Sequence, residues 1–251
     1  MTDIGARHSP GLQLTGERTL PGVPVENYWF RRHEAAYDGL LPFCRGALVL
    51  EAGCGEGYGA DRIATVASRV VAIDYDAGSA AHVARAYGRV RAVRGNVAAL
   101  PFAGGAFEVV ASLQVIEHLW DQPAFLAECR RVLRPAGTLL LSTPNRLTFA
   151  VANRPMNPFH HRELSARELT DLLTAGGFEV ARLLGLRHGR RLRGLDRRFS
   201  SLVDAQLAGP PSAWHPELRR EVARVRTRDF ELTGDDLDGS LDLVVVAVRR
   251  P

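Results

Sequence analysis

The sequence contains no lysine, so arginine supplies all 32 basic residues of this 251-residue chain. This absence excludes chemistry that depends on a lysine amine: the phosphate-binding lysine of P-loop nucleotidases, Schiff-base catalysis, and the tyrosine–lysine pair of short-chain dehydrogenases. The net charge of +4 would suit an anionic partner, but an arginine-biased globular protein reaches that charge without one. Charge alone therefore does not identify a partner.

Cysteine and long apolar runs are also scarce. Cys44, Cys54 and Cys129 are odd in number and far apart in the sequence, which argues against a disulfide framework and a cysteine-based zinc site. No segment approaches the roughly 20 apolar residues that a membrane span needs, and the sequence does not open with a basic-then-apolar signal pattern. We therefore expect a soluble, cytoplasmic protein with reduced thiols and no membrane span.

Apolar segments of strand length alternate with helical patterns from Ala47 onward. This alternation predicts a doubly wound, mostly parallel α/β sheet with helices on both faces. Ser165 followed by Glu168 predicts a capping box that opens one of the helices, and a further helix is expected from Pro216. The seven expected strands are 47–51, 69–74, 90–93, 107–113, 137–143, 178–184 and 241–248.

The sharpest local pattern is an apolar strand that runs into alternating glycines. Glu51 ends the strand, and Gly53, Gly55 and Gly57 follow it. Residues without a side chain let backbone approach a ligand where any Cβ would collide, although an ordinary glycine-rich turn looks the same. Asp74 adds weight to a ligand site, because a carboxylate at the end of the next strand can accept both hydroxyls of a ribose.

Two classes of cofactor remain open at this point. Residues 55–60, Gly-Glu-Gly-Tyr-Gly-Ala, fit the G-x-G-x-x-A pattern of dinucleotide-binding proteins, so an NAD(P)-dependent oxidoreductase is one alternative. Glu51 and Glu56 bracket the loop, however. Two carboxylates serve a pyrophosphate poorly, whereas they suit a cofactor with a cationic, amino-bearing end.

This segment resembles the first motif, E/D-x-G-x-G-x-G, of the class I S-adenosylmethionine-dependent methyltransferases. The resemblance continues through 95–102, 107–119 and 133–137, and it implies a seven-stranded, Rossmann-like methyltransferase fold. It also implies S-adenosylmethionine as the cofactor and S-adenosylhomocysteine as the product. The cofactor-binding residues that it implies are Glu51, Gly53, Cys54, Gly55, Gly57, Asp74, Tyr75, Asn96, Val97 and Gln114.

The resemblance also implies roles at the nucleoside end of the cofactor. Asp74 matches the ribose-binding acid, and Tyr75 follows it where the adenine face is commonly packed. Asn96 replaces an Asp whose side chain accepts a hydrogen bond from the adenine amino group. Its amide oxygen remains an acceptor, so the contact can survive without the charge. Val97 then supplies the backbone N–H that meets the ring.

Elimination favours a hydroxyl of a small molecule as the methyl acceptor. The loop after the fourth expected strand lacks the N/D-P-P-Y signature of amino-methylating enzymes, and the missing lysine removes the Lys-Asp-Lys-Glu set of RNA ribose methyltransferases. Residues 142–146 and 157–164 resemble segments of bacterial methyltransferases that act on cell-envelope sugars, quinones and secondary metabolites.

The whole chain is similar to an actinobacterial subgroup that includes sugar O-methyltransferases of polymethylated polysaccharide pathways. A saccharide acceptor is therefore expected. O- or N-methylation of a quinone or secondary metabolite stays open, as does a regulator that binds the cofactor without catalysis. The oligomeric state is not predicted.

Two histidines are candidates for the general base of an in-line displacement. His160 lies in a proline-bounded loop past the fifth expected strand, and His118 follows Glu117 past the fourth; either could instead hold its loop in place. Glu117 and His118 could also bind a divalent metal, as in the ubiquinone-type methyltransferases. Those enzymes usually carry a Glu where this chain has Gln114, so a divalent metal stays open as the less favoured alternative.

Several side chains are expected to contact the acceptor. Tyr28 and Trp29 are expected to close over the cofactor or stack on a sugar ring, or else to anchor the N-terminal arm to the core. His161 and Arg190 are further expected contacts, and the arginine-rich run 187–198 could bind phosphate, carboxylate or sugar hydroxyls. A solvated basic face explains that run equally well. Few aromatic residues interleave with the arginines, so no nucleic-acid partner is predicted.

The chain is expected to form one domain in four parts. An N-terminal arm and helix occupy 1–41, and the cofactor-binding core occupies 42–184. The insertion 185–240 is too long for a turn and too short and polar for a core of its own, which predicts a substrate-side appendage. The last strand lies in 241–251.

Overall fold

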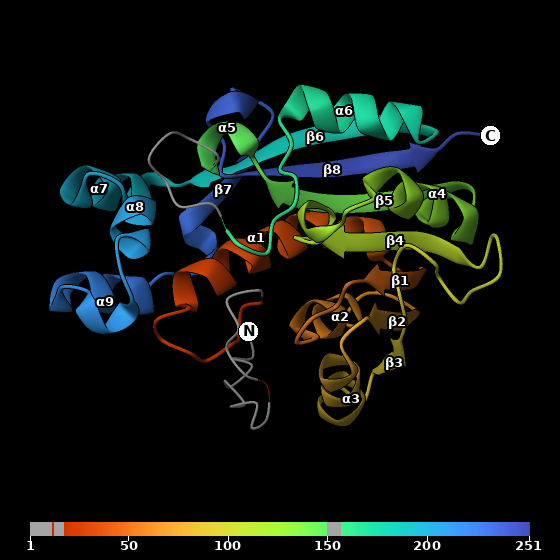
Figure 1. The fold of residues 1–251 in the computed structure, drawn as a ribbon, viewed down its shortest axis with the longest axis horizontal. Helices are drawn as coiled ribbons and strands as arrows, with labels where there is room; N and C mark the ends of the chain where they lie inside the picture. The colour runs from red at the N-terminus through yellow and green to blue at the C-terminus, as the bar shows by residue number, and fades with distance from the viewer. Residues whose placement is uncertain (1–11, 13–17, 150–156) are drawn as a thin grey trace.

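The computed structural model describes residues 12, 18–149 and 157–251. Within these ranges eight strands form one sheet in the order β3-β2-β1-β4-β5-β8-β6-β7 (Figure 1). Most of the expected N-terminal arm, 1–11 and 13–17, lies outside the described residues. The strands are β1 (Leu48–Ala52), β2 (Arg69–Asp74), β3 (Val90–Arg94), β4 (Phe107–Leu113), β5 (Leu133–Pro144), β6 (Phe178–His188), β7 (Phe230–Thr233) and β8 (Asp242–Arg249).

Strands β1 to β5 run parallel to one another, and β8 is antiparallel to both β5 and β6. The first strand pairs with β2 on one side and with β4 on the other. The order of the strands therefore reverses between β1 and β4. Crevices at such reversals are where open α/β sheets bind their ligands, outside the carboxyl ends of the strands.

The Rossmann-like, mostly parallel fold is confirmed, but the expected count of seven strands is wrong. The eighth strand, β7, pairs antiparallel with the end of β6 at the edge of the sheet. It was missed because it is only four residues long and lies in the insertion, where the strand–helix rhythm breaks. In addition, β5 begins at Leu133 rather than Gly137, and β6 continues to His188.

Helices cover both faces of the sheet, as expected (Figure 1). Helices α1, α2 and α3 pack on one face, and α4 and α6 pack on the other. Helices α7, α8 and α9 of the insertion lie beyond the carboxyl end of β6. The α-helices are α1 (Asn27–Cys44), α2 (Tyr58–Ile63), α3 (Ala77–Ala86), α4 (Gln122–Val132), α5 (Arg146–Phe149), α6 (Ala166–Ala175), α7 (Arg190–Phe199), α8 (Leu202–Leu207) and α9 (Pro216–Ala223).

Short 3₁₀ helices connect some of these elements. They are η1 (Ile116–His118), η2 (Pro211–Ala213), η3 (Thr227–Asp229) and η4 (Leu237–Gly239). No helix in the described ranges combines the length and apolarity that a bilayer crossing needs.

The core consists of two apolar layers, one on each face of the sheet. Because successive side chains of a strand point to opposite faces, Val49 and Val109 face α1 to α3, whereas Leu50 and Val110 face α4 and α6. All four side chains are almost completely buried. The central strands are therefore apolar on both faces, as a covered parallel sheet requires.

Two local predictions for helix starts are also confirmed. The Ser165 hydroxyl accepts a hydrogen bond from the Glu168 N–H at 3.3 Å, and the Glu168 carboxylate accepts one from the Ser165 N–H at 2.8 Å, which completes the capping box of α6. Helix α9 begins at Pro216 and buries Leu218 and Val222.

A buried ion pair joins α1 to β8. The guanidinium of Arg32 donates two hydrogen bonds to the Asp242 carboxylate, the one from Nε at 2.7 Å, and the exposed fractions of the two side chains are 3% and 1%. The Gln114 amide donates to the same carboxylate at 3.2 Å. Removing two charges from water is costly, and the paired, forked geometry offsets that cost only while both partners are present.

We expect Arg32→Met to destabilise the protein by about 3–5 kcal/mol, because it leaves the Asp242 carboxylate buried without its counter-charge. The free energy of unfolding in urea measures this loss. Arg167→Gln is the control, since Arg167 is 92% exposed and lies 3.8 Å from Asp171, a pair worth less than about 1 kcal/mol. Equal losses in the two variants would contradict the assigned role of the buried pair.

Candidate active site

A cavity of about 270 Å³ opens at the carboxyl ends of β1 and β4, at the reversal of strand order. The loops that follow β1, β2 and β4 form its walls, and α1 and the segment before it close the remaining side. The lining residues are Arg18, Thr19, His33, Tyr37, 53–56, Tyr58, Asp74, Tyr75, Val97, 113–115, His118 and Leu119.

The loop after β1 places its glycines where a side chain would be strained or would collide. Gly53 and Gly55 have φ angles of +83° and +53°, in the left-handed region that favours glycine. A Cβ on Gly53 would lie 2.6 Å from Cγ2 of Val115, so the missing side chain also lets the loops after β1 and β4 pack together. Cys54, between the two glycines, is buried and lines the cavity.

Asp74 is fixed at the end of β2 by the glycine loop. Its two carboxylate oxygens accept hydrogen bonds from the Gly55 N–H at 2.7 Å and the Asp76 N–H at 2.9 Å. Burial raises the pKa of the Asp74 carboxyl, and these two N–H groups and the nearby Arg18 guanidinium oppose that rise. Tyr75 lines the same cavity with 74% of its side chain exposed, so its ring is open to a ligand.

The two carboxylates that bracket the glycine loop have different environments. Glu56 accepts hydrogen bonds from the Tyr87 hydroxyl at 2.7 Å and from the His82 ring at 3.0 Å, so it is used to hold α3. Glu51 is fully buried and accepts from the Tyr37 hydroxyl at 2.7 Å, while its second oxygen has no hydrogen-bond partner among the described residues. Burial raises the pKa of Glu51 to about 8.

Residues before and within α1 complete the cavity, and sequence analysis did not assign them. The hydroxyl of Tyr58 is hydrogen-bonded to Thr19 at 3.1 Å and to the His33 ring at 3.2 Å. Burial lowers the pKa of His33 to about 3, so its ring is neutral. Arg18 donates to Asp76 at 3.0 Å. Local periodicity carries no sign that Arg18, before α1, would reach the residues that follow β2.

Asn96 and Gln114 differ in how they meet the cavity. The Asn96 amide oxygen accepts a hydrogen bond from the Ala98 N–H at 2.9 Å. Asn96 is not among the residues that line the cavity, whereas its neighbour Val97 is. Gln114 does line it, in a left-handed conformation with φ +57°. Its amide donates to Ser142 at 3.2 Å as well as to Asp242.

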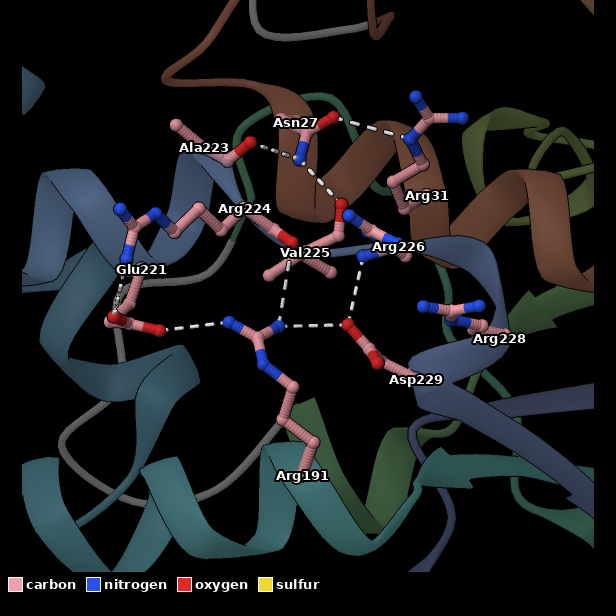
Figure 2. Close-up of a pocket in the computed structure, with 10 residues that line it drawn as sticks. All are labelled: Asn27, Arg31, Arg191, Glu221, Ala223, Arg224, Val225, Arg226, Arg228 and Asp229. Atoms are coloured by element: carbon pink, nitrogen blue, oxygen red, sulfur yellow. Dashed lines mark hydrogen bonds and ion pairs between the residues drawn. The ribbon is translucent and has the colours of Figure 1, made fainter. Parts of the chain in front are cut away.

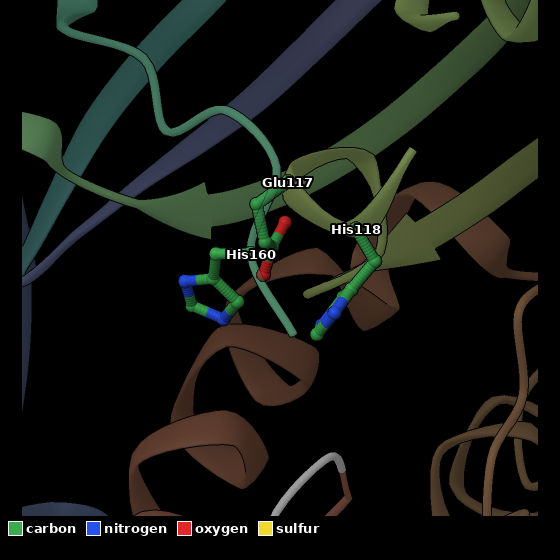
Figure 3. A group of neighbouring side chains, drawn as sticks. All are labelled: Glu117, His118 and His160. Atoms are coloured by element: carbon green, nitrogen blue, oxygen red, sulfur yellow. The ribbon is translucent and has the colours of Figure 1, made fainter. Parts of the chain in front are cut away.

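Three side chains gather beside this cavity: Glu117, His118 and His160 (Figure 3). Each offers one ligand atom, and these atoms lie within 4.8 Å of one another, so this group could hold a divalent metal ion. Glu117 is fully buried and accepts from the Thr143 hydroxyl at 3.0 Å with one oxygen, while its other oxygen has no partner. Burial raises the pKa of Glu117 to about 7, and the nearby His160 opposes the rise.

Backbone hydrogen bonds hold the two histidine-bearing loops together. The His161 N–H donates to the Glu117 carbonyl at 2.8 Å, and the His118 ring donates to the Phe159 carbonyl at 2.9 Å. The two rings, His118 and His160, are nearly perpendicular with centroids 4.8 Å apart. Of the two histidines, only His118 lines the cavity itself. Both histidines were candidates from the sequence, and the fold brings them together.

The expected contact of Tyr28 with the acceptor needs correction. Tyr28 is fully buried, its hydroxyl is hydrogen-bonded to His188 at 2.6 Å, and its ring packs against Phe230. It therefore anchors α1 to the core, which was the alternative that the sequence left open. Trp29 is half-buried against Phe149 and does not line the cavity.

The two other expected acceptor contacts are exposed. Arg190 is the first residue of α7 and lies outside the cavity. His161 stacks on Trp120 with ring centroids 3.8 Å apart, next in sequence to His160. Trp120 is 86% exposed, which is unusual for so large an apolar side chain.

Comparison with known proteins identifies the family. Residues 50–141 match the family model described as a methyltransferase domain. A relative from Mycolicibacterium smegmatis, named a probable S-adenosylmethionine-dependent methyltransferase, is 55% identical over 95% of each chain. A relative of the same description from Mycobacterium tuberculosis is 53% identical over 95% of this chain and 90% of its own.

A solved structure shows the same fold. The Burkholderia thailandensis 1,6-didemethyltoxoflavin-N1-methyltransferase, determined with bound S-adenosylhomocysteine, matches 88% of this chain and 79% of its own with a TM-score of 0.56 at 20% identity. The close mycobacterial relatives settle the choice between the two cofactor classes that the glycine motif left open. The chain belongs to the class I S-adenosylmethionine-dependent methyltransferases.

Proposed function

We propose that this methyltransferase transfers the methyl group of S-adenosylmethionine to a hydroxyl of a small molecule, with a saccharide as the favoured acceptor. The observation that carries the proposal is the position of His160 beside His118, which itself lines the cavity proposed for the methyl donor. A group that can take a proton therefore lies where an acceptor oxygen would meet the donor.

The cavity supports a specific orientation of the cofactor. Asp74 would hold the ribose hydroxyls, Tyr75 and Val97 would contact the adenine, and Gly53 and Gly55 would leave room for the methionyl part. The amino group of the cofactor lies near Glu51, whose unpartnered buried oxygen gains a cationic partner. Cys54, Gly57, Asn96 and Gln114 complete the proposed cofactor contacts.

His160 is proposed as the general base. Its Nδ1 donates to the Glu163 carboxylate at 2.6 Å, which orients the ring and stabilises the positive charge that the ring gains with a proton. Nε2 is then the acceptor of the proton. When bound, S-adenosylmethionine would supply the activated methyl group and leave as a neutral thioether, and His160 would take the hydroxyl proton as the acceptor oxygen is methylated. His118 lies between the donor and His160 and orients the acceptor oxygen.

Exposed aromatic surface supports a ring-shaped acceptor. The Trp120 ring packs against His161 at a tilt of 32°, and Trp120 is 86% exposed, so it offers apolar surface to the C–H face of a sugar ring. We further propose that the chain acts as one domain, and that Arg190 and the insertion contact parts of the acceptor farther from the methylated hydroxyl.

The first test concerns the cofactor site. Asp74→Ala should raise the dissociation constant for S-adenosylhomocysteine by about 100-fold or more, because two charge-assisted hydrogen bonds to the ribose are lost. Isothermal titration calorimetry measures the constant. Asp171→Ala, which removes an exposed carboxylate of α6, is the matched control and should bind like the wild type. Unchanged affinity in Asp74→Ala would refute the proposed orientation.

Cofactor affinity should also depend on pH through Glu51. Its pKa of about 8 means that the carboxyl is protonated below that pH, whereas a bound amino group favours the ionised form. Binding therefore releases a proton at lower pH, and the affinity for S-adenosylhomocysteine should rise from pH 6 to pH 8 and then level off. Calorimetry across this range measures it. Glu51→Gln should bind more weakly and lose this rise; the same rise in both proteins would rule Glu51 out as its source.

The base is tested by product formation. With a deuteromethyl-labelled donor and the whole small-molecule extract of the host, mass spectrometry should detect label on a saccharide. His160→Ala should lower the rate by about 100-fold or more while its affinity for S-adenosylhomocysteine stays unchanged. His215→Ala, an exposed histidine before α9, is the control.

Three outcomes of that experiment would count against the proposal. An unchanged rate in His160→Ala removes this residue from the mechanism. Label on a quinone or on a nitrogen atom rejects the saccharide acceptor. A protein that binds S-adenosylhomocysteine but labels no compound of the extract is a cofactor-binding regulator instead.

A further inference from the structure

A second cavity, of about 720 Å³, lies at the first turn of α1 and is separate from the proposed cofactor site (Figure 2). Its other walls come from α7, the end of α9 and the segment that leads into η3. The two cavities share no lining residue, although α1 contributes to both. A ligand here would therefore occupy a site of its own.

Hydrogen bonds between distant segments hold the walls of this cavity in place. The Asn27 amide donates to the carbonyls of Val222, Ala223 and Val225 at 3.0, 3.2 and 2.9 Å, and so ties the C-terminal end of α9 to α1. Arg191 of α7 joins the opposite wall by donating to Glu221 and Asp229, each at 2.8 Å (Figure 2). The cavity is therefore preformed.

Positive charge dominates the lining. Five arginines face only two carboxylates, and both carboxylates already bind Arg191. These carboxylates are largely buried, with 17% of Glu221 and 11% of Asp229 exposed, so they lie on the inner wall. The fifth arginine, Arg31, is paired with Glu34 at 2.7 Å.

The three remaining arginines are exposed to solvent, and few carboxylates lie near enough to neutralise their positive charges. Arg224 is 66% exposed and lies 3.9 Å from Glu221, which Arg191 already occupies. Arg226 and Arg228 are exposed, and within the described ranges neither forms an ion pair with a carboxylate. Three guanidinium groups are thus available at the mouth of a concave surface.

We propose that this cavity is a binding site for an oxyanion with two or more negative charges, such as the phosphate group of a small molecule. Guanidinium groups bind phosphate through paired, parallel hydrogen bonds, and a concave wall of one charge concentrates the attraction. The volume lies within the roughly 300–1,000 Å³ typical of small-molecule sites, so it has room for more than a bare phosphate.

The arrangement differs from a solvated basic face. Arginines spread over a convex helix would each meet water separately, whereas here residues from α1, α7 and the 224–228 segment converge on one hollow. Among the described residues that line the cavity none is aromatic, so they offer no stacking surface of the kind that single-stranded nucleic acids need. The site does not depend on the proposed methyl acceptor.

Calorimetric titration with sodium pyrophosphate, in a chloride buffer of fixed ionic strength, tests the site. The wild type should bind one pyrophosphate per chain with saturation. Arg226→Gln/Arg228→Gln should weaken binding by about tenfold or more, since two charged donors are removed. The affinity of this variant for S-adenosylhomocysteine should be unchanged, which also shows that it is folded.

The matched control is Arg167→Gln/Arg220→Gln, which removes the same charge from exposed arginines outside the lining. It should bind pyrophosphate like the wild type. Equal weakening in both double variants would show attraction by overall charge and overturn the site. Absence of saturable binding, or displacement of pyrophosphate by S-adenosylhomocysteine, would overturn it as well.

Discussion

The buried ion pair between Arg32 and Asp242 fixes α1 across the carboxyl edge of the sheet. Neither charge can leave its partner without remaining in an apolar interior, so α1 has one position relative to β8. The Gln114 amide joins the same carboxylate, and Gln114 belongs to the loop after β4. One pair of charges therefore positions a helix, a strand and a wall of the cofactor cavity together.

Helix geometry explains how α1 can serve two cavities. Residues four apart lie on one face of a helix, so Asn27 and Arg31 point to the arginine-lined cavity, and His33 and Tyr37 point to the cofactor cavity. Arg32 lies between these faces and holds the helix by its ion pair. Arg32 lines neither cavity, and its ion pair with Asp242 fixes the rotation of α1 about its own axis.

The sequence predicted what depends on neighbouring residues: seven of the eight strands, the capping box of α6 and the need for glycine in the loop after β1. It could not predict contacts between segments that only the fold brings together. His118 and His160 were named separately, but their 4.8 Å approach depends on backbone hydrogen bonds between two loops. The second cavity collects arginines from three segments, and the sequence showed only the α7 run among them. The role of Tyr28 could not be decided, because the sequence does not show whether an aromatic side chain is buried in the core or exposed to a ligand.

The two carboxylates of the glycine loop, Glu51 and Glu56, differ in their hydrogen-bond partners although their places in the sequence pattern are alike. Both Glu51 and Glu56 are buried, and the sequence treated them alike. Glu56 has its hydrogen bonds supplied by Tyr87 and His82, so it stabilises the fold and has little to offer a ligand. Glu51 keeps one buried oxygen without a partner, which costs folding free energy. A cationic group of a ligand would supply the missing partner and remove that cost. Glu51, rather than Glu56, is therefore the carboxylate expected to bind the ligand.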